Sequence, residues 1–122
     1  MLVAVAALAA PSLALASPRT GHYAGNDGVA FHVRLSPHGT LTVEDARYHA
    51  HAGFAQDSIH EGSFATCARV RINSVLHREY CIHGEFGSHD HAWGTVKVFH
   101  GAHGHTAHHA SETHHWSAVL TG

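Results

Sequence analysis

Lysine and arginine are scarce in this sequence, and charged residues of either sign are few. Asp, Glu, Lys and Arg make up 13% of the 122 residues, and Lys97 is the single lysine. Proteins that bind nucleic acid present Lys and Arg clustered on one face, and no stretch of this sequence contains such a cluster. The composition therefore argues against nucleic acid as a partner at neutral pH.

The sequence also lacks a long segment with the 3.6-residue periodicity of an amphipathic helix. Its one long apolar run covers residues 1–16, and Pro11 and Ser12 interrupt it. A membrane-spanning helix needs about 20 apolar residues, whereas Ala14-Leu15-Ala16 is typical of a signal-peptidase site. We therefore predict a signal peptide over 1–16, a single domain over 17–122, a secreted or cell-envelope location, and no membrane span after signal removal.

Cysteine occurs twice, and both residues lie in the segment 63–86, where apolar and polar residues alternate as in two β-strands with one buried face. Folding this segment about its midpoint places Cys67 opposite Cys81 and Arg69 opposite Glu79, so two complementary pairs share one register. Because an exported protein meets an oxidising compartment, we predict a Cys67–Cys81 disulfide on the solvent side. It would stabilise the fold by about 3 kcal/mol. The alternative is two small buried side chains.

Further alternating segments predict strands at 29–35, 40–46, 48–54, 92–99 and 116–120, with turns between them. Six or seven short strands predict an all-β fold, either an antiparallel β-sandwich or a small barrel. The apolar phase of the strands gives the expected core: Phe31, Val33, Tyr48, Phe64, Val70, Tyr80, Ile82, Val96 and Trp116. The polar atoms of Tyr80 and Trp116 should find partners at the edge of this core.

Six short motifs follow one another along the chain: Gly21-x-Tyr23-x-Gly25, Val29-x-Phe31-x-Val33, Gly62-x-Phe64, Ile82-x-Gly84-x-Phe86, Ala92-x-Gly94-Thr95-Val96 and Trp116-Ser117-Ala118. Their order resembles that in small secreted β-proteins common in actinobacteria, over nearly all of the expected mature chain. That family is largely uncharacterised, so the resemblance implies fold and export but no reaction. Its members usually carry one Cys after the second strand and another before the final Trp, where this chain has His49/His51 and His114/His115.

Histidine, with 17 residues, is present in large excess. Protonation of these side chains between about pH 7 and 5 would turn a weakly acidic chain into a strongly basic one. Neutral imidazole is also a common ligand of Zn, Cu(II) and Ni(II). His49 and His51 can share one face of a strand, with a third ligand from an opposite strand, and His89 and His91 flank Asp90, a further oxygen ligand or hydrogen-bond acceptor. The candidate metal ligands are His49, His51, His89, His91, His103, His105, His108 and His109.

Residues 100–115 consist mainly of Gly, Ala, Thr and His, and contain no apolar side chain larger than Ala. This composition predicts an exposed loop that is mobile without metal. Its clustered imidazoles should bind Zn, Cu or Ni and order the loop. Because protonated imidazole cannot ligate a metal, binding should weaken as the pH falls through about 6.5.

Enzyme motifs do not appear: the sequence has no G-x-S-x-G elbow and no H-E-x-x-H helix. We therefore expect a secreted, non-enzymatic β-domain that binds divalent metal ions with low specificity through clustered histidines. The alternative is a structural or interaction module of the cell envelope, in which histidine is a surface filler or a pH-responsive charge. Metal titration distinguishes the two, because only the first predicts tight, stoichiometric binding.

Overall fold

A computed structural model describes residues 21–26, 30–36, 40–55, 59–60, 62–88, 90–102, 105–106 and 108–122. The predicted signal peptide, 1–16, lies outside these residues. The described residues contain no helix. They form the following strands: β1 (Tyr23–Asn26), β2 (Phe31–Ser36), β3 (Thr40–Asp45), β4 (Ala50–Ala55), β5 (Ile59–His60), β6 (Ser63–Arg71), β7 (Leu76–Phe86), β8 (His91–Ala102), β9 (His105–Thr106) and β10 (Glu112–Leu120).

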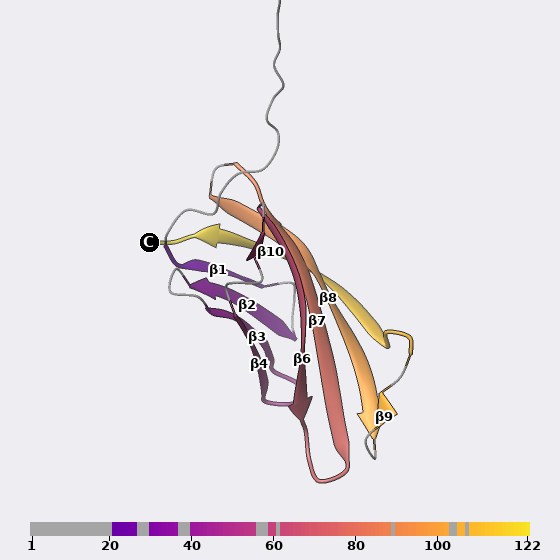
Figure 1. Ribbon diagram of the computed structural model, residues 1–122. Helices are drawn as coiled ribbons and strands as arrows, with labels where there is room; N and C mark the ends of the chain where they lie inside the picture. The colour runs from indigo at the N-terminus through magenta and orange to yellow at the C-terminus, as the bar shows by residue number, and fades with distance from the viewer. Residues whose placement is uncertain are drawn as a thin grey trace, which may run out of the picture.

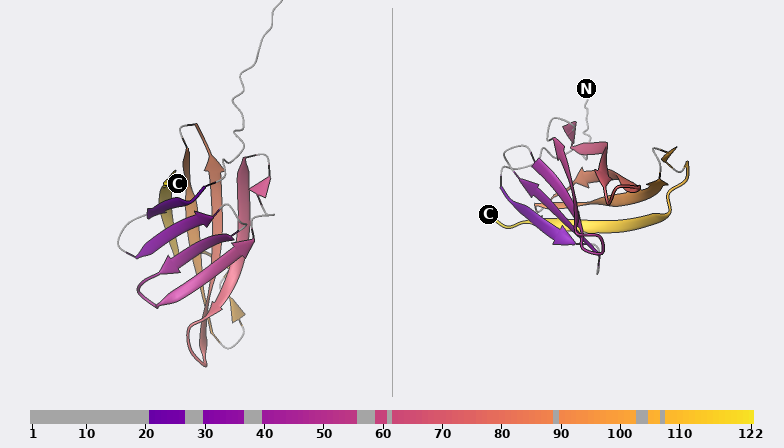
Figure 2. Two further views of the ribbon diagram at one scale, coloured as in Figure 1. Left: turned by 90° about the vertical axis from the view of Figure 1, so that its left-hand side faces the viewer. Right: turned by 90° about the horizontal axis from the view of Figure 1, so that it is seen from below.

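All of these strands belong to one antiparallel sheet with the order β4-β3-β2-β1-β10-β8-β7-β6-β5, and β9 adds to β8. The sheet curls until β4 comes close to β6, so that it is nearly closed and barrel-like (Figure 2). The short strands β1–β4 form one wall, and the long strands β6, β7, β8 and β10 form the other, called the long wall below. Figure 1 shows β7 and β8 running past the ends of the short strands. The predicted all-β fold is confirmed, with more strands than expected.

The core lies between the two walls, on the inward phase of each strand. Seven predicted core residues are at most 3% exposed: Phe31, Val33, Phe64, Tyr80, Ile82, Val96 and Trp116. Tyr48 and Val70 are only half-buried. Tyr48 belongs to the turn at 46–49 instead of a strand, and Val70 lies near the far end of β6. Wherever a predicted strand is present, the alternation therefore predicted correctly which of its side chains point inward.

The β6–β7 hairpin has the predicted register. Cys67 pairs with Cys81 and Arg69 with Glu79 across the two strands. The cysteines form a disulfide with their Cα atoms 4.0 Å apart. Cys67 is exposed and Cys81 half-buried, because both occupy the outward phase of their strands. The predicted bridge and its position on the solvent side are confirmed.

The segment 100–115 is not the continuous loop that its composition predicted. Strand β8 extends to Ala102, β9 pairs with the end of β8, and β10 already begins at Glu112. The prediction was wrong because it assigned a strand only where apolar residues occupy every second position. Here the inward positions at these strand ends are polar, and their side chains hydrogen-bond to one another.

Candidate functional site: a polar cluster on the inner face

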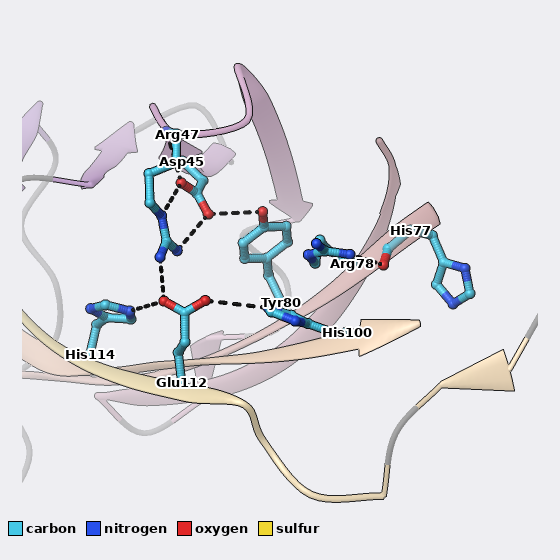
Figure 3. A network of polar contacts seen from close by, with 8 residues as sticks. All are labelled: Asp45, Arg47, His77, Arg78, Tyr80, His100, Glu112 and His114. Carbon is cyan, nitrogen blue, oxygen red and sulfur yellow. Dashed lines mark hydrogen bonds and ion pairs between the residues drawn. The ribbon is translucent and has the colours of Figure 1, made fainter. Parts of the chain in front are cut away.

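At one end of the long wall, polar side chains occupy the inward positions that apolar residues fill elsewhere. The alternation of inward and outward positions along each strand continues unbroken. Along β8, His100 follows Val96 and Val98 on the inward side, and along β10, Glu112 and His114 precede Trp116 on that side. Asp45 is the last residue of β3, and its side chain points inward. The inner-face cluster comprises Asp45, Arg47, Arg78, Tyr80, His100, Glu112 and His114. Figure 3 shows all of these except Arg78 linked into one network of hydrogen bonds and ion pairs, with Arg78 to one side.

Asp45 is the buried acceptor of the cluster, at 1% exposure. Its Oδ1 accepts hydrogen bonds from the backbone N–H and the Nε of Arg47, each at 3.1 Å. Its Oδ2 accepts from Arg47 Nη2 at 3.0 Å and from the Tyr80 hydroxyl at 3.1 Å. The Asp-x-Arg sequence supports this arrangement locally, because an Asp side chain readily binds the backbone two residues on. Four donors thus compensate for the burial of one carboxylate.

The pKa values of these groups reflect the same contacts. Burial, followed by the adjacent Asp45 carboxylate, raises the pKa of Tyr80, so its hydroxyl stays protonated and donates. The hydrogen bonds to Asp45 raise the pKa of Arg47 more than burial lowers it. Arg47 is therefore a fixed positive charge that links the turn after β3 to the long wall.

Glu112 joins the two histidines of the cluster. Its Oε1 accepts from Arg47 Nη1 and lies 3.0 Å from His114 Nε2, and its Oε2 lies 3.3 Å from His100 Nε2. Burial alone would raise the pKa of Glu112, but hydrogen bonds from Arg47, His114 and His100 together lower it to about 2. The carboxylate is consequently ionised at every pH near neutrality.

Aromatic rings pack against one histidine and the two arginines of the cluster. The His114 ring lies on Phe31 with the ring centroids 4.2 Å apart. The Arg47 guanidinium lies 5.3 Å from the Phe31 centroid and 5.2 Å from that of Tyr48. Arg78 packs on the same Tyr48 ring, 4.9 Å from its centroid. Such contacts stabilise a guanidinium by about 0.5–2 kcal/mol, depending on its solvation.

Arg78 is the most enclosed cation of the cluster, with 8% exposure. It is the register partner of His100 on β8, and its Nη1 donates to the His77 carbonyl at 3.0 Å. Within the described part of the chain, its Nε is buried and has no hydrogen-bond partner. Because Arg78 is the third residue of β7, it lies at the side of the cluster nearest the β6–β7 turn.

Chemically, the cluster provides two imidazoles and one ionised carboxylate within hydrogen-bonding distance. These are ligands that zinc and other borderline metals accept. In the described residues, no group of three or more His, Cys, Asp or Glu side chains is already arranged to hold a metal ion. In this cluster, both Nε2 atoms point at the carboxylate oxygens themselves. Metal binding here requires the side chains to move apart around the ion.

The residues predicted from sequence as metal ligands lie elsewhere. His49 has a φ of 51° in the turn at 46–49, so it does not share a strand face with His51, contrary to the prediction. His51 lies on β4 opposite Glu44, with His51 Nδ1 3.3 Å from Glu44 Oε1. His91 begins β8, where its ring centroid lies 5.4 Å from that of Trp93.

Three of the remaining candidates, His105, His108 and His109, lie between the end of β8 and the start of β10. His108 and His109 are exposed in the bend before β10, and His105 belongs to β9. His89 and His103 lie outside the described residues. The sequence reasoning missed His100, Glu112 and His114. The inward phase of each strand could have been extended from sequence: Val96 and Val98 lead on to His100, and Ala118 and Trp116 lead back to His114 and Glu112. Their contacts with one another and with Arg47 depend on strand pairing.

The fold and the cluster define a class: an all-β domain with one disulfide and a polar cluster at one end of its core. The chain was compared with protein-family models, with curated proteins and with solved structures, and no match was found. Within the described residues, no helix has the length and apolar character needed to span a membrane. The disulfide is compatible with an extracellular location.

Proposed function

We propose that this is a secreted or cell-envelope, non-enzymatic domain that binds a divalent transition-metal ion through the histidine-rich segment 100–115. The anchoring ligands are His100, Glu112 and His114. The observation that carries the proposal is that His100 Nε2 and His114 Nε2 lie 3.3 and 3.0 Å from oxygens of the same carboxylate. The segment thus brings two imidazoles from its opposite ends to one acid.

The ligand chemistry favours Zn, Cu or Ni. Two imidazoles and one carboxylate form a mixed N/O donor set that suits these ions. Glu112 needs no deprotonation, because its pKa of about 2 leaves it ionised at neutral pH. The competing cation is Arg47, which already contacts Glu112 Oε1. In the metal complex, Glu112 ligates through Oε2, and Arg47 stays on Oε1 as the group that orients the carboxylate.

A fourth ligand comes from water or from the connection between β8 and β10. That connection carries imidazoles at 103, 105, 108 and 109. His108 and His109 are exposed and lie just before Glu112, so an ion at the cluster has further nitrogen donors within the same segment. Such a site is tolerant of metal identity, because imidazole suits all three ions and geometry decides among them.

Isothermal titration of the purified protein with ZnCl₂ at about pH 7.5 tests the proposal, with one ion bound per chain expected. Loss of two of three ligands in the double variant His100→Ala/His114→Ala should weaken binding at least about a hundredfold. The matched control is His22→Ala/His32→Ala, which removes two imidazoles that are not part of the inner-face cluster and should bind as the parent does. Circular dichroism verifies that each variant is folded.

Three outcomes contradict the proposal. The cluster is not the site if His100→Ala/His114→Ala binds as tightly as the parent while folded. Binding is non-specific if the His22→Ala/His32→Ala control loses as much affinity. If the parent binds no ion below the millimolar range, the histidines serve as surface residues or pH-responsive charges of a cell-envelope module.

A further inference from the structure

Trp93 is an exposed aromatic ring that the structure holds in one position on the outer face of β8. Its side chain is 41% exposed. The ring lies directly over Gly87, where an added Cβ would come within 2.3 Å of Trp93 Cζ3 and 2.5 Å of Cη2. The His91 ring packs beside it, with the ring centroids 5.4 Å apart. The indole is therefore supported by backbone and a second ring, and its accessible surface faces solvent.

The surroundings of this ring are mainly polar, with one exposed apolar side chain, Val119, which is the register partner of His91 on β10. Glu85 on β7 and Ser117 on β10 are the register partners of Trp93, one on each side, and both are exposed. The next outward row places Thr95 between His83 and His115. The polar groups around the ring are thus a carboxylate, two hydroxyls and, with His91, three imidazoles, all of which can form hydrogen bonds. An apolar protein partner would need a contiguous apolar patch of several hundred Å². Trp93 and Val119 are the large apolar side chains exposed here, and two partly exposed side chains are too few for such a patch.

We propose that the Trp93 platform, comprising Trp93 with Glu85, His91, Thr95 and Ser117, binds a β-1,4-linked polysaccharide of glucosyl or N-acetylglucosaminyl units. The ring substituents of these sugars are equatorial, so each face of the pyranose presents only C–H groups. Such a face stacks on the electron-rich face of an indole. The hydroxyls at the ring edge then meet the surrounding hydrogen-bonding side chains. A fixed flat ring with a polar border is complementary to this combination of surfaces.

The chemistry distinguishes this ligand from the other classes that an exposed Trp could take. A nucleic acid would need Lys and Arg around the stacked base, whereas the register partners of Trp93 are an acid and a hydroxyl. The proposal is independent of metal binding, because the platform is on the outer face and the inner-face cluster is on the opposite side of the sheet. The two can be tested separately, with a chelator present throughout the sugar titrations.

Tryptophan fluorescence provides a direct readout. The chain contains two tryptophans, and Trp116 is only 3% exposed, so a change in emission on adding sugar reports Trp93. Titration with cellohexaose in one arm and with N-acetylated chitohexaose in the other should give a dissociation constant below about 1 mM in at least one arm. The arm that binds more tightly identifies the sugar.

Three variants, assayed by calorimetry in the same buffer, locate the site. Trp93→Ala should weaken binding at least about tenfold. Gly87→Ala retains the indole but displaces it from its support, and should also weaken binding about tenfold. Val75→Ser removes a side chain of similar exposure, 43%, at the far turn of the β6–β7 hairpin and should bind as the parent does.

The proposal is overturned by any of the following results. Neither sugar binds at concentrations up to about 10 mM. Trp93→Ala or Gly87→Ala binds as tightly as the parent. Sedimentation shows that the chain self-associates through Trp93, which would assign the platform to a second copy of the chain instead of a sugar.

Discussion

Replacing Glu112 with Gln should remove a large, pH-dependent contribution to stability. The change keeps the shape of the side chain but removes the charge that Arg47 compensates and that lies within hydrogen-bonding distance of the two histidines. The pKa of Glu112 falls from its ordinary value of 4.5 to about 2 on folding. Since one unit corresponds to about 1.4 kcal/mol, ionised Glu112 stabilises the fold by about 3 kcal/mol. The side chain is 23% exposed, so solvent screening makes this an upper figure.

The sign of the pH dependence follows from the lowered pKa. The stabilisation is fully present above the unfolded pKa of about 4.5 and is lost as the pH falls through about 2. The difference in free energy of unfolding between the parent and Glu112→Gln should therefore be largest at neutral pH. It should shrink steadily between about pH 4.5 and pH 2.

Denaturant unfolding of both proteins at a series of pH values, with the disulfide intact, measures this difference. The exposed acid Glu85 supplies a matched control: the same series on Glu85→Gln measures the effect of removing one carboxylate outside the cluster. Parallel stability curves for the parent and Glu112→Gln between pH 7 and pH 2 would show that Glu112 carries no special interaction. The assignment of the cluster as a coupled unit would then be wrong.

Two further predictions concern stability alone. Tyr80→Phe removes the hydroxyl that donates to Asp45 at 3.1 Å and should lower the free energy of unfolding by about 1.5–3 kcal/mol, measured in urea; a change below about 0.5 kcal/mol would contradict the buried hydrogen bond. Cys67→Ser/Cys81→Ser should lower the free energy of unfolding by about 3 kcal/mol without changing the strand content. A variant as stable as the parent would show that the bridge adds nothing to the pairing of β6 with β7.

The β6–β7 hairpin was predictable because its side chains specify its register twice. Its apolar alternation determines which face is inward, and the Arg69–Glu79 and Cys67–Cys81 pairs each fix the same alignment. A slip of one residue would reverse every inward and outward position. Local information of this kind was sufficient for fold class, disulfide and most of the core.

Other elements depend on contacts that are distant in sequence. Strand β1 was missed because its four residues include Gly25 and Asn26, which are poor strand formers. It is paired on both sides, with β2 and β10. Gly25 is required there, since a Cβ would come within 1.9 Å of the Ser117 carbonyl oxygen. The strand thus results from its neighbours and not from its own propensity.

The candidate site was the hardest part to predict. Histidine has no strong preference for strand or loop, so composition alone assigned His100 and His114 to a loop. Their inward position follows from the register of β8 with β7 and β10. The contact of Glu112 with Arg47 joins residues 65 positions apart. Neither spacing nor alternation within one segment contains that information.

Crystallography of the zinc-loaded protein, with anomalous scattering at the zinc edge, tests the central claim most directly. We predict one anomalous peak per chain, located between His100 Nε2, His114 Nε2 and Glu112 Oε2, with metal–ligand distances of about 2.0–2.2 Å. A peak at His51 and Glu44 on the outer face, or at other surface histidines with the inner-face cluster unchanged, would contradict it.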